Sequence, residues 1–128
     1  MLEHADITEK ILSSCFNVIH ELGAGFIESV YQKSLLIALR EEGLEVREQV
    51  PLAVYFRGQC VGEFFADIIV EDKVIVELKA IKSLLPEHQA QLINYLKATG
   101  MTVGLLVNFG NAKLEYKRLF NKNKLNGD

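Results

Sequence analysis

The stretch that decides the fold spans residues 64–79 and reads FFADIIVEDKVIVELK. Two runs of β-branched and aromatic residues flank the polar triplet at residues 71–73, a pattern typical of a β-hairpin with a short connection. The first run is interrupted by Asp67, and the second by Glu77 and Lys79. Because an isolated buried carboxylate is costly, each of these acids is expected to have a partner.

The length of the hairpin loop sets which charged residues share a face of the sheet. Glu77 and Lys79 point the same way because successive strand residues alternate between faces. If Asp67 lies directly opposite Glu77, Val70 pairs with Val74 and a three-residue loop remains. A two-residue loop would send the two carboxylates to opposite faces. The loop lacks the Asn-Gly or Asp-Gly pair that two-residue turns favour, so we predict the three-residue loop, with all three charges on one face.

Hydrophobic periodicity predicts the other elements. Helices are expected at residues 7–22, 26–42 and 86–99, and strands at 44–56, 59–70, 74–81, 102–108 and 113–119. Asp6 or Thr8 is predicted to cap the first helix and Ser83 the third, and Pro51 places its strand at a sheet edge or bulge. The third helix favours a crossover to a parallel strand. We therefore predict an α/β fold, with one mixed β-sheet flanked by helices.

Length and charge narrow the class of protein. The chain has 128 residues, a length that predicts one domain, which we place at residues 1–120. It has 14 basic and 17 acidic residues and a formal charge of −3, which excludes a strongly basic nucleic-acid binder. Residues 121–128 are expected to be a frayed basic tail. The two cysteines lack the spacing of a zinc site. Because no apolar run resembles a signal peptide or a membrane span, we expect a soluble cytoplasmic protein with no membrane partner.

The charged residues of the hairpin have two interpretations. A divalent cation shared by Asp67 and Glu77 would satisfy both carboxylates, with Lys79 near a reacting water or phosphate. Alternatively, a buried Asp–Lys or Glu–Lys ion pair holds the hairpin together and has no catalytic role. Composition alone leaves both interpretations open.

Three motifs together resemble a known family. The order Asp67, nine residues, then Glu77-x-Lys79 in consecutive strands resembles the core of the PD-(D/E)XK nuclease superfamily. Residues 25–31, GFIESVY, are similar to the signature of the GxxExxY family within it, and residues 88–96, HQAQLINYL, also resemble that family. Ala66 stands where the family sometimes has proline before its aspartate.

The resemblance implies a restriction-endonuclease-like core and metal-assisted hydrolysis of a phosphodiester bond in DNA or RNA, with nucleic acid as the partner. It assigns the ligands of one or two Mg²⁺ or Mn²⁺ ions to Glu28, Asp67, Glu77 and the carbonyl of Leu78. It assigns the water-orienting role to Lys79, and it gives Gln91 and Tyr95, a pair similar to a QxxxY element, the positioning of the site or substrate. A homodimer or a partner protein would supply specificity. The alternative is a catalytically silent nucleic-acid- or protein-binding module of the same fold.

Three residues in or near these motifs also have simpler structural interpretations. Glu28 in the first turn of a helix could do no more than offset the helix dipole. Tyr31, on the same helix face, either packs in the core or hydrogen-bonds a site carboxylate. His88 is expected at the surface or as a helix cap rather than as a catalyst.

Overall fold

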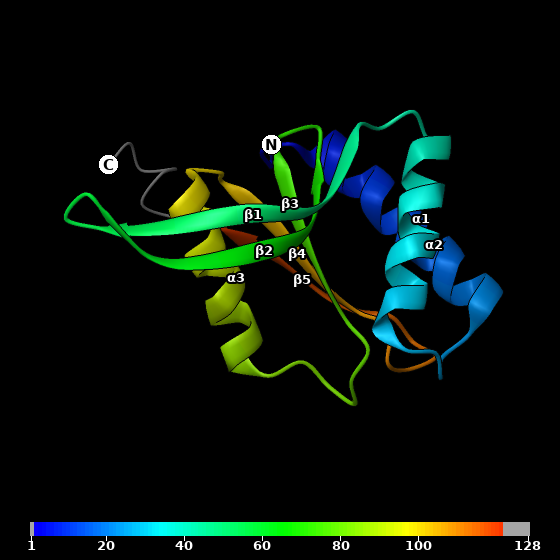
Figure 1. Ribbon diagram of the computed structural model, residues 1–128. Helices are drawn as coiled ribbons and strands as arrows, with labels where there is room; N and C mark the ends of the chain where they lie inside the picture. The colour runs from blue at the N-terminus through cyan, green and yellow to red at the C-terminus, as the bar shows by residue number, and fades with distance from the viewer. Residues whose placement is uncertain (1, 122–128) are drawn as a thin grey trace.

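The computed structural model describes residues 2–121, which form a five-stranded sheet covered by helices on both faces (Figure 1). The elements follow in the order α1 (Ala5–Leu22), α2 (Glu28–Glu41), β1 (Val46–Phe56), β2 (Gln59–Val70), β3 (Val74–Lys79), α3 (Pro86–Thr99), β4 (Val103–Asn108) and β5 (Glu115–Phe120). Neighbouring strands are antiparallel except β3 and β4, which are parallel and joined through α3. The predicted mixed sheet and crossover are confirmed.

The strand β3 is buried on both faces, and each face has its own core. Val74, Val76 and Leu78 pack with side chains of α1 and α2. Ile75, one residue out of phase with them, packs with Leu92 and the rest of the α3 side. Because both faces are closed, a charged residue in β3 has no route to bulk water except at the end of the strand.

The strands β2 and β3 pair for three residues and then separate. Val70 pairs with Val74 and Ile68 with Val76, so the predicted register and the three-residue loop at 71–73 are confirmed. The β1–β2 ladder continues much further, to the Arg57-Gly58 turn. Figure 1 shows this hairpin reaching past β3 and over α3. We call the point where β2 and β3 separate the fork, and the projecting part of β1 and β2 the hairpin arm.

The alternation of faces breaks at the fork. Ala66 and Ile69 both belong to the α3-side core, although strict alternation would place residues three apart on opposite faces. Gln49 of β1, opposite this point, has a positive φ of 46°, which is uncommon for a residue other than glycine. Asp67 lies inside this irregular segment, so its orientation does not follow from the period-two pattern.

Two capping predictions are wrong, although all predicted elements are present and their ends agree within two residues. Asp6 and Thr8 lie inside α1, which begins one residue before Asp6. The N-cap of α3 is Leu85 rather than Ser83, because proline at the next position fixes the first helical residue. The Leu85 N–H donates to Nδ1 of His88 at 3.0 Å, so His88 is a helix cap as predicted.

Three further predictions concern the edge of the sheet, the C-terminal tail and membrane-spanning segments. β1 lies at the edge of the sheet, as Pro51 predicted. The predicted frayed tail falls outside the described residues except Asn121, which is buried. Within residues 2–121, no helix is long and apolar enough to cross a membrane.

The connection that follows β3 is held by a buried asparagine that the sequence did not single out. Oδ1 of Asn108 accepts the N–H groups of Ile81 and Gly110, each at 3.0 Å. Its Nδ2 donates to the Ile81 carbonyl at 3.0 Å and to Oε1 of Glu115 at 3.1 Å. These bonds fix the backbone directly after Lys79.

We expect Gly110→Ala to destabilise the protein more than Gly104→Ala does. A Cβ at position 110 would overlap the carbonyl oxygen of Ile81, whereas at position 104 it would approach only the Leu92 side chain, at 3.0 Å. Backbone cannot move aside as a side chain can, so the loss at position 110 should be about 1–3 kcal/mol or more. Urea denaturation of both variants measures the difference, and an equal or smaller loss for Gly110→Ala contradicts the prediction.

Candidate active site

Asp67 and Glu77 meet at the fork, and each accepts a backbone N–H from the other residue's strand. Oε1 of Glu77 accepts the N–H of Asp67 at 3.0 Å, and Oδ2 of Asp67 accepts the N–H of Leu78 at 2.9 Å. The ladder between β2 and β3 has ended at this point, so the carboxylates satisfy strand N–H groups that would otherwise lack an acceptor. The structure therefore brings each of the two predicted acids into contact with the backbone of the other's strand.

Glu77 is the most deeply buried charged group of the cluster, with 5% of its surface exposed. Burial, and then the negative charge of Asp67, raise its pKa to about 8, against the opposing effects of the Asp67 N–H and of Lys79. The pKa of Glu28, half-buried at the start of α2, is raised by burial and by the charge of Asp67 and lowered by Lys79. The three acids and one lysine thus form one electrostatic cluster, in which a further positive charge would be stabilising.

Lys79 lies at the end of β3, half-buried, and forms no ion pair with an acid among the described residues. The interpretation of a buried Asp–Lys or Glu–Lys pair holding the hairpin therefore has no direct contact to support it. Hydrogen bonds from the carboxylates to backbone N–H groups hold the strands instead. The positive charge of Lys79 acts on Glu28 and Glu77 without direct contact and lowers the pKa of each.

The donor set fits a hard divalent cation held by two carboxylates. Among residues 2–121, no three Asp, Glu, His or Cys side chains lie close enough together to hold a metal ion. Within the same residues, the hydrogen bonds at the fork engage one oxygen each of Asp67 and Glu77 and leave the second oxygen to another ligand. Mg²⁺ is commonly bound by one or two carboxylates completed by water and phosphate. Glu28 stands outside this pair, and its place as a ligand stays a prediction.

Tyr95 and Gln91 of α3 lie on the other side of the fork. Tyr95 is buried in the same core cluster as Ala66, the neighbour of Asp67. Its pKa is raised by that burial and then by the charges of Glu77 and Asp67. Its ring centre lies 5.9 Å from that of Phe64 in β2. Gln91 is exposed and lines a groove together with Tyr95.

This groove, which we call the hairpin–α3 groove, has a volume of about 800 Å³. Its walls are the hairpin arm on one side and α3 on the other. The lining residues are Ala53, Val54, Tyr55, Phe64, Glu87, Ala90, Gln91, Asn94, Tyr95, Lys97 and Ala98. The groove therefore contains two of the predicted site residues.

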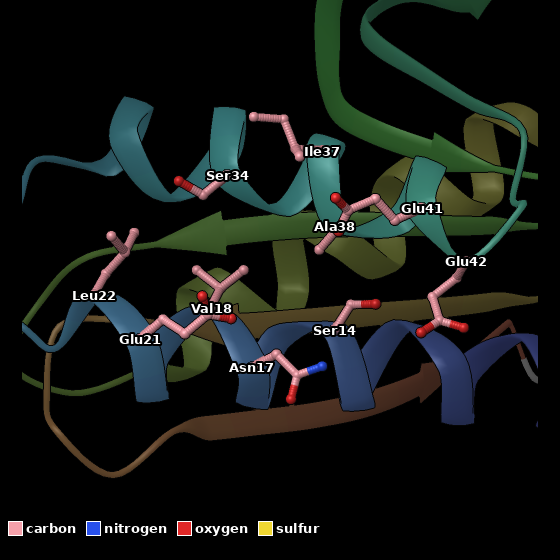
Figure 2. A pocket seen from close by; sticks show the side chains of 10 residues that line it. All are labelled: Ser14, Asn17, Val18, Glu21, Leu22, Ser34, Ile37, Ala38, Glu41 and Glu42. Atoms are coloured by element: carbon pink, nitrogen blue, oxygen red, sulfur yellow. The ribbon is translucent and has the colours of Figure 1, made fainter.

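A second hollow, between α1 and α2, contains none of the predicted site residues. Figure 2 shows its side chains, among them Glu21, Glu41 and Glu42, arranged along the two facing helices. It has a volume of about 300 Å³. The candidate site is the fork with its adjoining groove, and this second hollow has no part in it.

Gln32 is a residue of the site that sequence reasoning missed. Its Nε2 donates to the carbonyl oxygen of Asp67 at 3.2 Å, and the side chain is buried. It follows Glu28 by four residues and so shares its helix face, which is the signal that could have found it. Gln32 ties α2 to the irregular segment of β2.

Tyr31 takes the packing role of its two predicted alternatives. The ring is fully buried and stacks on Phe109, with 5.0 Å between ring centres. Its hydroxyl donates to the carbonyl of Gly23 at 2.6 Å and accepts the N–H of Phe26 at 3.2 Å. Tyr31 therefore fixes the α1–α2 loop, and through it the position of Glu28.

Comparison with known proteins identifies the family. The family model of the PD-(D/E)XK nuclease superfamily matches residues 5–119. The chain belongs to this superfamily. The predicted superfamily is confirmed. PD-(D/E)XK nucleases generally use divalent metal ions and act on nucleic acid, which agrees with the donor set at the fork.

Two solved structures are similar in fold to this chain. The crystal structure of SSO0001 is 19% identical, covers 72% of this chain and 48% of its own, and gives a TM-score of 0.58, so the chain spans about half the length of that protein. An alkaline exonuclease (LHK-Exo) from Laribacter hongkongensis is 13% identical, covers 99% of this chain and 75% of its own, and gives a TM-score of 0.56. No curated protein matches the chain. These likenesses show a restriction-endonuclease-like α/β fold.

Burial of Glu77 makes the stability of the metal-free protein depend on pH. Its pKa of about 8 in the folded state lies above the ordinary value of 4.5, so the folded protein retains a proton that the unfolded chain loses. The contribution of Glu77 is fully present below pH 4.5 and is lost as pH rises through about 8. We expect Glu77→Gln, which keeps the hydrogen-bond acceptor, to reduce the fall in the free energy of unfolding between pH 5 and pH 8.

Urea denaturation in EDTA at several pH values measures this slope. Glu63→Gln, which removes an exposed acid from the neighbouring strand β2, is the matched control and should leave the slope as in the wild type. Equal slopes for the wild type and Glu77→Gln would contradict the prediction that the folded protein retains a proton on Glu77.

Proposed function

We propose that the protein is a metal-dependent nuclease that hydrolyses phosphodiester bonds of DNA or RNA and belongs to the GxxExxY family. The observation that carries the proposal is the contact of Asp67 and Glu77 with each other's strand at the fork. It occurs in a chain of the PD-(D/E)XK nuclease superfamily, next to a half-buried lysine. The assignment to the GxxExxY family rests on residues 25–31 and 88–96.

Asp67, Glu77 and the carbonyl of Leu78 would hold Mg²⁺ or Mn²⁺, with Glu28 as a further acid facing the same charge. When bound, the ion supplies positive charge to the phosphate and favours deprotonation of the attacking water. Asp67 and Glu77 would bind the ion through their negative charge, and their hydrogen bonds to backbone N–H groups hold both side chains in position before the ion binds.

Lys79, Gln91 and Tyr95 would act on the water and the substrate. The Lys79 ammonium would orient the attacking water and stabilise the negative charge that develops on the phosphoryl oxygens. Gln91, exposed in the groove, would contact the substrate backbone, and Tyr95, buried beside the acids, would hold the carboxylates in position. A second copy of the chain or a partner protein would add binding contacts to the nucleic acid, which a chain of net charge −3 attracts weakly.

The second candidate is a catalytically silent nucleic-acid- or protein-binding module of the same fold. It is favoured by the finding that, among residues 2–121, no three candidate ligands stand close enough to hold a metal. Incubating the protein with labelled single- and double-stranded DNA and RNA, with Mg²⁺, Mn²⁺ or EDTA, separates the two candidates. Metal-dependent cleavage supports the nuclease, and no cleavage of any substrate supports the silent module.

We expect Glu77→Gln and Lys79→Ala to abolish cleavage while the protein stays folded. The first keeps the shape and acceptor of the side chain but removes a charge from the metal site, and the second removes the water-orienting ammonium. The loss of turnover should be about a hundredfold or more, the size typical of removing an acid–base or charge-stabilising group. Turnover is measured on the best substrate of the screen, and folding by thermal melting.

Each variant has a matched control. Glu63→Gln and Lys82→Ala make the same chemical changes at exposed residues and should keep wild-type turnover. Wild-type turnover in Glu77→Gln or Lys79→Ala contradicts the assignment. Unfolding of both would mean that the charged residues hold the hairpin together and have no catalytic role.

A further inference from the structure

We propose that the hairpin–α3 groove binds single-stranded nucleic acid, with unpaired bases stacked on Tyr55 and Phe64. This inference rests on the proposed nuclease function and adds to it the class of substrate and the surface that selects it. Neither aromatic residue belongs to the motifs that the sequence analysis assigned to chemistry.

The groove begins at the fork and runs outward from it. Phe64 precedes Asp67 by three residues in β2, and its ring lies against that of Tyr95, which packs in the same core cluster as Ala66, the neighbour of Asp67. Gln91 lines the groove one helical turn before Tyr95. A strand whose phosphate lies at the fork therefore has its neighbouring nucleotides within the groove.

The hairpin arm exposes aromatic rings that the fold itself does not use. Tyr55 and Phe64 in the groove wall are 66% and 44% exposed, and Phe56 and Phe65 on the same arm are also exposed. At the tip, the guanidinium of Arg57 lies 4.9 Å from the centre of the Phe56 ring. Large exposed apolar patches of this kind mark interaction sites. Of these four rings, Tyr55 and Phe64 line the groove.

The chemistry of the lining favours unpaired bases over a duplex. Aromatic side chains stack on bases whose faces are free, which a duplex offers only at its ends. The polar side chains of the lining include two amides, Gln91 and Asn94, and the opposite charges of Glu87 and Lys97. The amides match the hydrogen-bonding edges of bases.

Binding without turnover tests this site separately from catalysis. Fluorescence anisotropy in EDTA measures the dissociation constants of the wild type for a labelled 12-nucleotide single strand, its duplex, and a 12-nucleotide strand with consecutive abasic sites. The variants are Tyr55→Ala, Phe64→Ala and Phe64→Leu, which keeps apolar packing against Tyr95 but has no aromatic face. Phe16→Ala is the matched control, because Phe16 is 47% exposed and lies on α1, away from the groove.

The wild type is expected to bind the single strand at least tenfold more tightly than the duplex or the abasic strand. Each groove variant should weaken single-strand binding by about tenfold, while Phe16→Ala leaves it unchanged. Equal affinity for all three nucleic acids overturns the proposal, as does wild-type affinity in Phe64→Leu. A dimer that Phe64→Ala converts to monomer in ultracentrifugation, without single-strand binding, assigns the arm to self-association and also overturns it. Cleavage that persists while stacking fails leaves the nuclease function intact, and stacking without cleavage refutes the nuclease function alone.

Discussion

The exchange of hydrogen bonds between Asp67, Glu77 and the backbone of the opposite strand is the constraint on which the site depends. β2 must leave β3 so that the hairpin arm can reach over α3, and that separation exposes N–H groups in a buried place. The two carboxyl groups satisfy those N–H groups, and the result is a pair of acids held close together, with Glu77 buried. The separation of β2 from β3 is therefore the cause both of the hydrogen bonds at the fork and of the electrostatic repulsion between the two acids.

The surrounding elements hold this arrangement from three sides. Gln32 of α2 binds the Asp67 carbonyl, Tyr95 of α3 stands beside the acids, and Asn108 of β4 fixes the chain just after Lys79. A repulsive pair of carboxylates persists only where such neighbours fix its geometry. The unused carboxylate oxygens then favour a cation, which links the folding constraint to the metal-dependent chemistry of PD-(D/E)XK nucleases.

The local parts of this arrangement could be predicted from the sequence. The apolar runs around Asp67 and Glu77 and the absence of a two-residue turn motif correctly gave the register of β2 and β3, because pairing next to a loop depends on nearby residues. Alternation failed at Asp67, in the segment of β2 opposite Gln49, which has a positive φ. Gln32 and Asn108 were missed because their partners lie 35 and 27 residues away in the chain, and no periodic pattern reports such contacts. The groove was missed because it arises from tertiary packing of α3 beneath the arm.

The measurement that tests the central claim most directly is thermal melting of the wild type and of Asp67→Asn, with EDTA and with Mg²⁺ or Mn²⁺. The asparagine still accepts the Leu78 N–H but lacks the charge. If the fork is a cation site, metal at a hundredfold excess over its dissociation constant stabilises the wild type by about 2.7 kcal/mol. Asp67→Asn then shows a smaller metal shift and melts higher than the wild type in EDTA. A wild type that melts identically with and without metal, together with an Asp67→Asn variant less stable in EDTA, would contradict the account and make the two carboxylates purely structural.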